Sequence, residues 1–216
     1  MVTIVRGTVP ASEFALSHAL ETVPGLEFEI ERIVDTGDHA IMPLLWVRGT
    51  DGRAVDVFEE DPTVQEAELL SEFDGEWLYQ MEWVAHIELV LRMLTNSEAA
   101  ILDAFGKEDR WKLRVMFPER EKFADTHEFC EDHGLSFQVE SIRELDGDPA
   151  GRFGLTTEQF EALATATRRG LFAVPREATV EEIAEEFDVS HQAMSERIRR
   201  ATGALVEDTL LVGFSE

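Results

Sequence analysis

One segment near the C-terminus constrains the fold of this chain more than any other. Residues 179–201 read TVEEIAEEFDVSHQAMSERIRRA, in which Thr179 and Glu182 form a capping-box pair at the start of a helix. After a short break, Ser190 can cap a second helix. Apolar residues then recur at the spacing of one helical face: Met194, Ile198, Ala201 and Leu205. This pattern predicts two helices joined by a tight turn, either as a helix-turn-helix or as a plain helical hairpin in a core.

The second predicted helix, residues 190–202, has polar side chains opposite its apolar stripe. In a helix-turn-helix this helix enters the major groove, where Gln pairs with adenine, Arg with guanine and Glu with cytosine. A solvated helix face is the alternative, but three arginines within four positions of so acidic a chain favour DNA. We therefore expect double-stranded DNA as a partner and a set of contacting residues: Thr179, Ser190, His191, Gln192, Ser195, Glu196, Arg197, Arg199 and Arg200. Arg197 and Arg200 flank the face and suit phosphate contacts.

Residues 154–211 resemble a known module. A connector, Pro175-Arg176-Glu177, and the start Ser190-His191-Gln192 are unusual together, and further matching landmarks surround them: Leu155-Thr156, Gln159, Ala162-Leu163, Gly170, Val174, Thr179, Glu182-Ile183-Ala184, Ala193 and Ser195-Glu196-Arg197. The segment is similar to the C-terminal helix-turn-helix of the bacterio-opsin-activator-type regulators of halophilic archaea. The N-terminal part is similar, more weakly, to the domain found beside this module in that family. The resemblance implies a transcription regulator; we expect no long PAS or GAF sensor module, so the input signal stays open.

The charge of the chain fits a halophilic setting on physical grounds. It carries 45 acidic and 19 basic residues, a formal net charge of -26. Such self-repulsion destabilises a compact chain in dilute salt, whereas at molar salt the Debye length falls to ~3 Å. Residues 1–154 hold 33 acidic and 13 basic residues (net -20), and residues 155–216 hold 12 and 6 (net -6). A nucleic-acid mimic is an alternative for so acidic a chain; disorder is disfavoured, because 44% of the residues are apolar.

The sequence predicts an α+β fold, with an α/β domain over residues 1–146, a linker over 147–154 and a helix-turn-helix domain over 155–216. Strands are expected at 3–5, 26–33 (with a shift after Ile30), 41–47, 54–58, 77–83, 99–105, 111–117 and 135–142. Helices are expected at 12–22 (capped by Ser12), 62–73, 86–94 and 119–133. Turns are expected at 50–52 and 106–109.

An internal repeat runs through the N-terminal domain. Residues 14–33 align without gaps to residues 123–142, with eight of 20 positions identical. Each copy follows a short strand and a proline, so the repeated unit is strand-helix-strand. Two such units predict a duplicated split βαβ, or ferredoxin-like, sandwich. Convergence of amphipathic patterns is the alternative explanation for so short a window.

No catalytic residues are expected, and the protein is not expected to be an enzyme. His127, Cys130 and His133 lie on one predicted helix, but the third is at the edge of reach and no fourth ligand is evident, so no metal and no cofactor are expected. Cys130 is the only cysteine, which excludes an intrachain disulfide. No signal peptide is expected, and no apolar run approaches the roughly 20 residues that span a bilayer. We expect a cytoplasmic protein with no membrane contact.

The expected function is DNA-binding transcription regulation, with an N-terminal domain that senses a small-molecule effector or mediates assembly. A homodimer is expected, because a single module reads few base pairs and because sheet edges and the apolar residues 205–214 could form an interface. The alternative is an interaction protein that binds another regulator without contacting DNA. The operator, the effector and the direction of regulation do not follow from the sequence.

Overall fold

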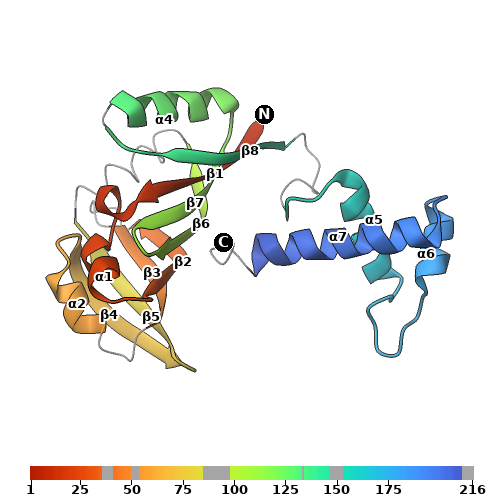
Figure 1. Ribbon diagram of the computed structural model, residues 1–216, viewed down its shortest axis with the longest axis horizontal. Helices are drawn as coiled ribbons and strands as arrows, with labels where there is room; N and C mark the ends of the chain where they lie inside the picture. The colour runs from red at the N-terminus through yellow and green to blue at the C-terminus, as the bar shows by residue number, and fades with distance from the viewer. Residues whose placement is uncertain (36–40, 50–53, 85–97, 133, 146–152, 211–216) are drawn as a thin grey trace. The chain divides into compact units, whose positions relative to one another are not determined.

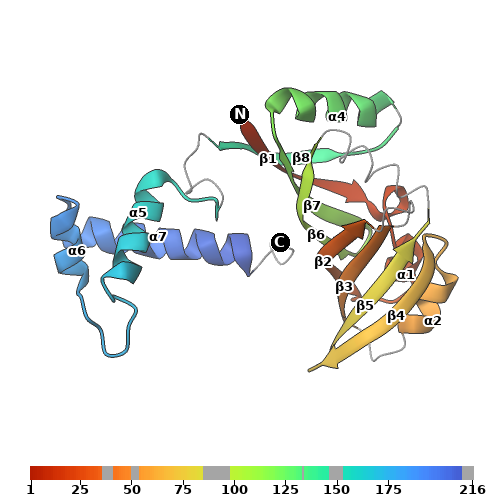
Figure 2. The same cartoon turned by 180° about the vertical axis from the view of Figure 1, so that it is seen from behind.

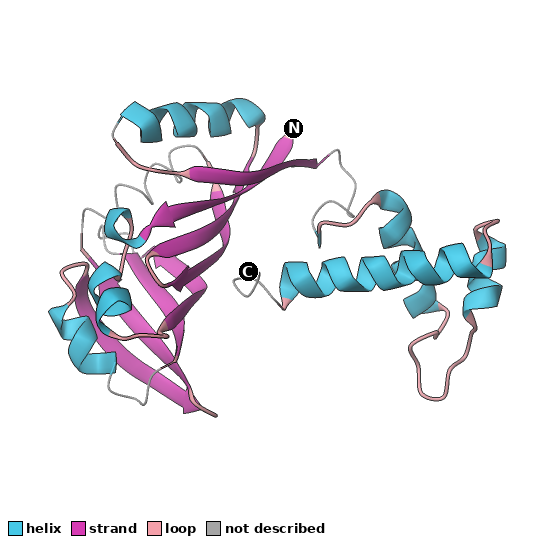
Figure 3. Cartoon of the chain, viewed as in Figure 1, coloured by secondary structure: helices cyan, strands magenta, loops and turns pink. Residues whose placement is uncertain are grey.

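The structure is a computed structural model that describes residues 1–35, 41–49, 54–84, 98–132, 134–145 and 153–210. The chain divides into two compact units, residues 1–143 and 144–216 (Figure 1). The predicted linker and the predicted turn 50–52 fall largely or wholly outside the described residues, as does the predicted helix 86–94. The structure thus combines a mixed unit of strands and helices with a helical C-terminal unit (Figure 3).

The first unit is built on one sheet, in which the described residues form eight strands in the order β4-β5-β3-β2-β6-β7-β1-β8. Their bounds are β1 Val2–Pro10, β2 Glu27–Asp35, β3 Ile41–Arg48, β4 Val64–Phe73, β5 Glu76–Trp83, β6 Ala100–Lys107, β7 Arg110–Phe117 and β8 Gln138–Leu145. Strand β7 pairs antiparallel with both β1 and β6, with Val5 opposite Val115 in the first ladder. Residues alternate between faces along each strand, so β5 and β7 bury every second side chain.

Helices cover the buried face of this sheet. They are the 3-10 turn η1 (Ala11–Glu13) and the helices α1 (Ser17–Thr22), α2 (Ala54–Glu60) and α4 (Arg120–Asp132). Helices α1 and α2 pack against each other, and α4 packs on β1 and β7. Figure 2 shows the sheet from behind, with α1 and α2 beside β4 and β5.

Aromatic side chains fill the core between sheet and helices. The Trp111 ring meets Phe14 edge to face at a centroid distance of 5.2 Å and stacks on Phe28 at 6.0 Å. Phe58 of α2 meets Tyr79 of β5 at 5.1 Å. Trp111 is fully buried, yet its indole Nε1–H donates to the Ala15 carbonyl at 2.7 Å. A buried indole needs such a partner, so this bond ties β7 to the segment before α1.

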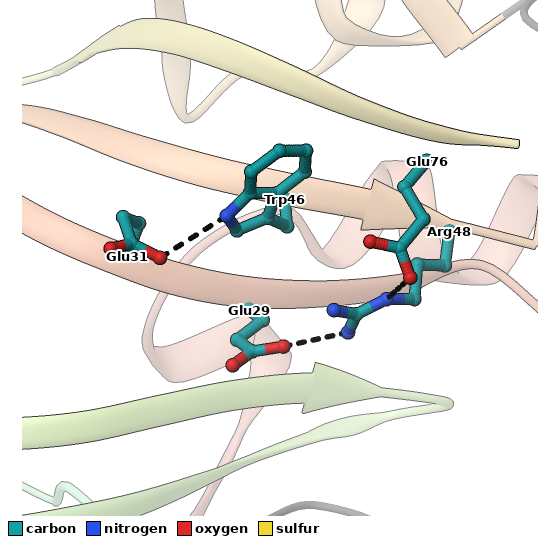
Figure 4. Close-up of polar contacts among 5 residues, drawn as sticks. All are labelled: Glu29, Glu31, Trp46, Arg48 and Glu76. Atoms are coloured by element: carbon teal, nitrogen blue, oxygen red, sulfur yellow. Dashed lines mark hydrogen bonds and ion pairs between the residues drawn. The ribbon is translucent and has the colours of Figure 1, made fainter. Parts of the chain in front are cut away.

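The side chains on the opposite face of β3 and β5 are half-buried, and this face carries the polar cluster in Figure 4. The Arg48 guanidinium donates to Glu29 at 2.7 Å and to Glu76 at 2.6 Å, which links β2, β3 and β5. Desolvation lowers the pKa of Arg48, but its bonds to Glu76 and Glu29 outweigh that effect and the pKa is raised. Trp46 Nε1–H donates to Glu31 at 3.1 Å. One cation thus holds two carboxylates of a very acidic unit together.

Two predicted elements are wrong. Most of residues 62–73, predicted as a helix, form β4 (Val64–Phe73), which pairs with β5 through a two-residue turn at Asp74 and Gly75. Both turn residues have positive φ (49° and 84°), which matches the Asp-Gly hairpin preference. Residues 54–58, predicted as a strand, belong to α2. In this helix the Phe58 ring packs against the rings of Phe28 and Tyr79.

The predicted helix 12–22 begins later than expected, and Ser12 does not cap it. Residues 11–13 form η1, and α1 starts at Ser17. Its first amides are satisfied from outside the helix: Leu16 N–H donates to Thr63 Oγ1 at 2.9 Å, and Ala19 N–H donates to Asp61 Oδ2 at 3.0 Å. Asp61 is buried and also accepts from the Thr63 amide at 2.9 Å. Asp61 and Thr63, which are more than 40 residues away in the sequence, therefore cap α1 in place of a local residue.

Other predictions are confirmed. Strands appear at 41–47 and 77–83, the hairpin joins β6 to β7, and the helix at 119–133 is α4. The shift expected after Ile30 is a register irregularity between Ile30 and Arg32 in the β2–β3 ladder. The strands expected at 3–5, 26–33 and 135–142 are present as β1, β2 and β8 with different ends.

The duplicated ferredoxin-like arrangement is not confirmed. Both copies of the repeat contain a helix followed by a glycine with positive φ, Gly25 and Gly134, and then a strand. However, β1 is antiparallel to β7, β7 to β6 and β6 to β2. Strands β1 and β2 therefore run in opposite directions, whereas a βαβ unit requires parallel strands. The first copy has the local features of the repeat without that topology.

Candidate nucleic-acid interface

The described residues of the second unit form three helices: α5 (Thr157–Arg168), α6 (Val180–Glu186) and α7 (His191–Thr209). Thr179 Oγ1 accepts from the Glu182 amide at 3.3 Å, while Thr179 N–H donates to the Glu182 carboxylate at 2.7 Å. Ser190 Oγ accepts from the Ala193 amide at 3.1 Å. The predicted capping box and the predicted second cap are both confirmed. Helix α7 continues to Thr209, seven residues past the predicted end of the recognition helix.

The three helices share one core, so the segment is a helix-turn-helix supported by a further helix. Ile183 and Ala184 of α6 pack with Met194 and Ile198 of α7. Further members of this cluster come from α5 and the turn after it: Ala162, Ala166 and Leu171. Between α6 and α7 the chain turns at Asp188, whose φ of 51° is one that Asp adopts more readily than most residues. Of the stripe predicted at Met194, Ile198, Ala201 and Leu205, the first three residues are buried and Leu205 is half-buried.

The nine predicted DNA-contacting residues lie at the start of α6 and along α7. Seven are exposed: Thr179, Ser190, His191, Gln192, Ser195, Arg199 and Arg200. Glu196 and Arg197 are half-buried. The spacing of Gln192, Glu196 and Arg199 places them in one row, opposite Met194 and Ile198. The hydroxyls of Thr179 and Ser190 cap α6 and α7. Each of these two predicted contact residues therefore lies at the start of a helix.

Charge near this row is local and limited. Residues 190–202 hold three arginines and one glutamate, and Arg200 pairs with that glutamate, Glu196, at 3.3 Å one turn away. Helix α6 and its surroundings are acidic and exposed, with Glu181, Glu182, Glu185 and Glu186. With few cations on the surface, few counterions are released on binding, so the salt dependence should be weak for a DNA-binding domain.

Sequence reasoning missed two features of this unit. Arg169, just after α5, forms an ion pair with Glu186 of α6 at 2.8 Å and thereby ties two helices together. The loop between α5 and α6 exposes apolar side chains, with Phe172 53% and Val174 98% exposed. The sequence shows the apolar run Leu171-Phe172-Ala173-Val174-Pro175. Only the structure shows that Leu171 is buried whereas Phe172 and Val174 are exposed.

Comparison with known families identifies both units. Residues 155–207 match the family described as HTH DNA binding domain. Residues 8–157, well over half of the chain, match the family described as GAF and HTH_10 associated domain. The chain belongs to this family. It is a bacterio-opsin-activator-like regulator whose helix-turn-helix is a DNA-binding domain, as the resemblance implied. No curated protein matches the chain.

Two further observations concern this regulator. None of the helices in the described residues is both long and apolar enough to cross a bilayer. Within the same residues, no group of three or more His, Cys, Asp or Glu side chains could hold a metal ion. His133, one member of the cluster considered from the sequence, lies outside the described residues.

Proposed function

We propose that α7 lies in the major groove of DNA through residues 190–202 and that the first unit senses an effector or mediates assembly. One observation supports the DNA contact. Gln192, Glu196 and Arg199 form a row in the N-terminal half of α7, opposite the buried Met194 and Ile198. This is the orientation that a recognition helix needs. The regulator acts by binding alone, without catalysis.

The side chains divide between bases and phosphates. Gln192 and Arg199 read base edges, because they are exposed and lie on the outward row. Arg197 and Arg200 contact phosphates, because they lie three residues apart along one side of that row, between it and the buried stripe. Ser190, at the start of α7, supports a phosphate contact through the first amides of that helix, because helix N-termini attract anions. Thr179 positions the start of α6, where its amide already donates to the Glu182 carboxylate.

The experiment compares base-reading and phosphate-binding variants in molar KCl, with DNA fragments selected from a genomic pool. Gln192→Ala and Arg199→Ala should each lose discrimination at one base pair, by about 1–3 kcal/mol. Arg200→Ala should weaken all sequences alike. Glu207→Ala, exposed on α7 beyond the row, is the matched control and should bind as the unaltered protein does. Specific binding that survives both Gln192→Ala and Arg199→Ala would refute the assignment.

The regulator works as a homodimer in this proposal, because two recognition helices about 34 Å apart double the readout. Strand β4 supports an interface: it is an edge strand of the sheet and exposes Leu69, Leu70 and Phe73. An unprotected apolar edge invites pairing with another chain. Light scattering in molar KCl should give the mass of two chains, and Phe73→Lys should reduce it. A one-chain mass at micromolar concentration would contradict the dimer. Residues 211–216 of the apolar tail lie outside the described residues.

A second function, contact with another regulatory protein, is favoured by the exposed loop side chains of Phe172 and Val174. Exposed apolar groups on one loop are a common feature of protein contacts. A Phe172→Ser, Val174→Ser double variant separates the two functions. If DNA binding is the whole function, this variant should bind DNA and regulate normally. Normal DNA binding with lost regulation would instead indicate a protein partner at this loop.

A further inference from the structure

A hollow lies under α4 in the first unit, between this helix and the strands on which it packs. Its lining comes from five segments: β1, η1, β7, α4 and the connection from α4 to β8. Val115 and Phe117 form the sheet side, Phe123 and Cys130 the helix side, and Leu135 and Phe137 the connection. In Figure 1, α4 spans above β8 and β1. The core elsewhere in the unit is filled by the aromatic cluster around Trp111.

The hollow is small and open at its mouth. Its cavity volume is about 30 Å³, more than the roughly 10–15 Å³ that one water molecule needs. Together with the open solvent at its mouth, the space is about 510 Å³. A ligand can therefore place only one edge under α4, with the rest of it in the open mouth.

The chemistry of the lining excludes a charged ligand from the enclosed part. Glu13 is the acidic lining residue, and its carboxylate already accepts from the Ser136 amide at 2.5 Å and the Ser136 hydroxyl at 3.0 Å. Burial raises the pKa of the Cys130 thiol, so this group is neutral at pH 7. His127 is half-buried, and its ring lies against Phe123. The lining residues include no lysine or arginine that would compensate an anion, and burying an unpaired charge is costly.

Ring geometry favours an aromatic ligand over an aliphatic one. Phe117 and Phe123 meet edge to face at a centroid distance of 5.5 Å, and Phe123 meets His127 in the same way at 5.8 Å. Phe137 completes the ring set because Gly7 of β1 lacks a side chain: a Cβ there would lie 2.7 Å from the Phe137 ring. Edges and faces of these rings can pair with a further ring at distances of about 4.5–7 Å.

We propose that the hollow under α4 binds a small uncharged aromatic molecule, which acts as the effector of the regulator. The effector role rests on the function proposed above; the binding does not. Helix α4 leads through the lining residues Leu135 and Phe137 into β8, the last strand before the second unit. A ligand under α4 therefore touches the segment that continues into the DNA-binding unit.

The test uses the full chain in molar KCl without DNA, and the single cysteine as reporter. Cys130 is labelled with N-ethylmaleimide at fixed pH and labelling is followed by mass spectrometry. Toluene is the probe, benzoate its charged counterpart and methylcyclohexane its aliphatic counterpart. Toluene should slow labelling saturably, by severalfold or more, and benzoate should not. No slowing by toluene, or equal slowing by benzoate or methylcyclohexane, would overturn the proposal.

Filled variants provide the second arm, read by calorimetry and thermal melting. Leu135→Phe and Cys130→Met each add volume to the hollow from a different segment, and each should abolish toluene binding while the protein still melts cooperatively. Ala124→Leu, exposed on α4, is the matched control and should bind toluene normally. Toluene binding that persists in a folded filled variant would contradict the site. Because DNA is absent throughout, a failure to bind toluene would not contradict DNA binding by α7. A failure to bind DNA would likewise not contradict the site under α4.

Discussion

At the scale of single residues, Gly170 decides how the first helix of the DNA-binding unit ends. Its φ is 75°, in the left-handed region, and its N–H donates to the Thr167 carbonyl at 3.1 Å. The next amide, Leu171 N–H, donates to the Ala166 carbonyl at 2.9 Å, which completes a Schellman motif. A Cβ at Gly170 would also lie 2.8 Å from the Glu177 Cβ.

We expect Gly170→Ala to lower the free energy of unfolding by about 1–3 kcal/mol, through the strained φ and the contact with Glu177. Urea unfolding in molar KCl, followed by circular dichroism, measures this. Gly203→Ala is the matched control: Gly203 lies within α7 with open space around it, so alanine should stabilise by about 0.5–1 kcal/mol. An unchanged unfolding midpoint for Gly170→Ala would contradict the role given to this glycine.

At the scale of elements, the start of α6 depends on the charge of Glu182. The hydrogen bonds from the Thr179 backbone and then from its side chain lower the pKa of Glu182 below its usual value of 4.5. A group whose pKa is lower in the folded state stabilises above its unfolded pKa, and this contribution is lost as pH falls through the folded pKa. The stabilisation should therefore be complete near neutral pH and disappear below about pH 4.5.

Glu182→Gln should remove this part of the pH dependence, because the amide still accepts a hydrogen bond but does not titrate. Thermal melts between pH 7 and pH 3 in molar KCl measure the effect, as the difference between the variant and the unaltered protein. Glu181→Gln, exposed on the same turn, leaves the capping pair intact and serves as control. Identical pH profiles for the Glu182 variant and the unaltered protein would show that the capping carboxylate does not contribute.

Elements also differ in how well the sequence predicts them. The caps at Thr179 and Ser190 were predictable, because capping is decided by residues three positions apart. Strand β4 was not, because Val64, Ala67 and Leu70 also fit a helical period, and pairing with β5 decided between the two. The Asp74-Gly75 turn was a local signal of that pairing and should have outweighed the period.

At the scale of the whole molecule, charge governs the conditions of folding. The net charge of -26 is spread over an acidic chain in which Arg48, Arg169 and a few other cations hold carboxylates together. We expect a large rise in melting temperature between 0.1 M and ~3 M KCl, because the Debye length falls from about 10 Å to 3 Å or less. Differential scanning fluorimetry measures it, with choline chloride at equal ionic strength to separate screening from specific ions. A flat response would contradict the halophilic interpretation.

What the sequence alone determined about this regulator is mainly local. The helix starts of the DNA-binding unit, the buried stripe of α7 and the β6–β7 hairpin follow from residues a few positions apart, and all are present. Only the tertiary structure decided the single sheet, the cap of α1 by Asp61 and Thr63, and the opposite directions of β1 and β2. These features depend on partners tens of residues away, whose choice follows from packing and from the satisfaction of buried backbone groups. The hollow under α4 belongs with them, because its walls come from five segments that meet only in the folded chain.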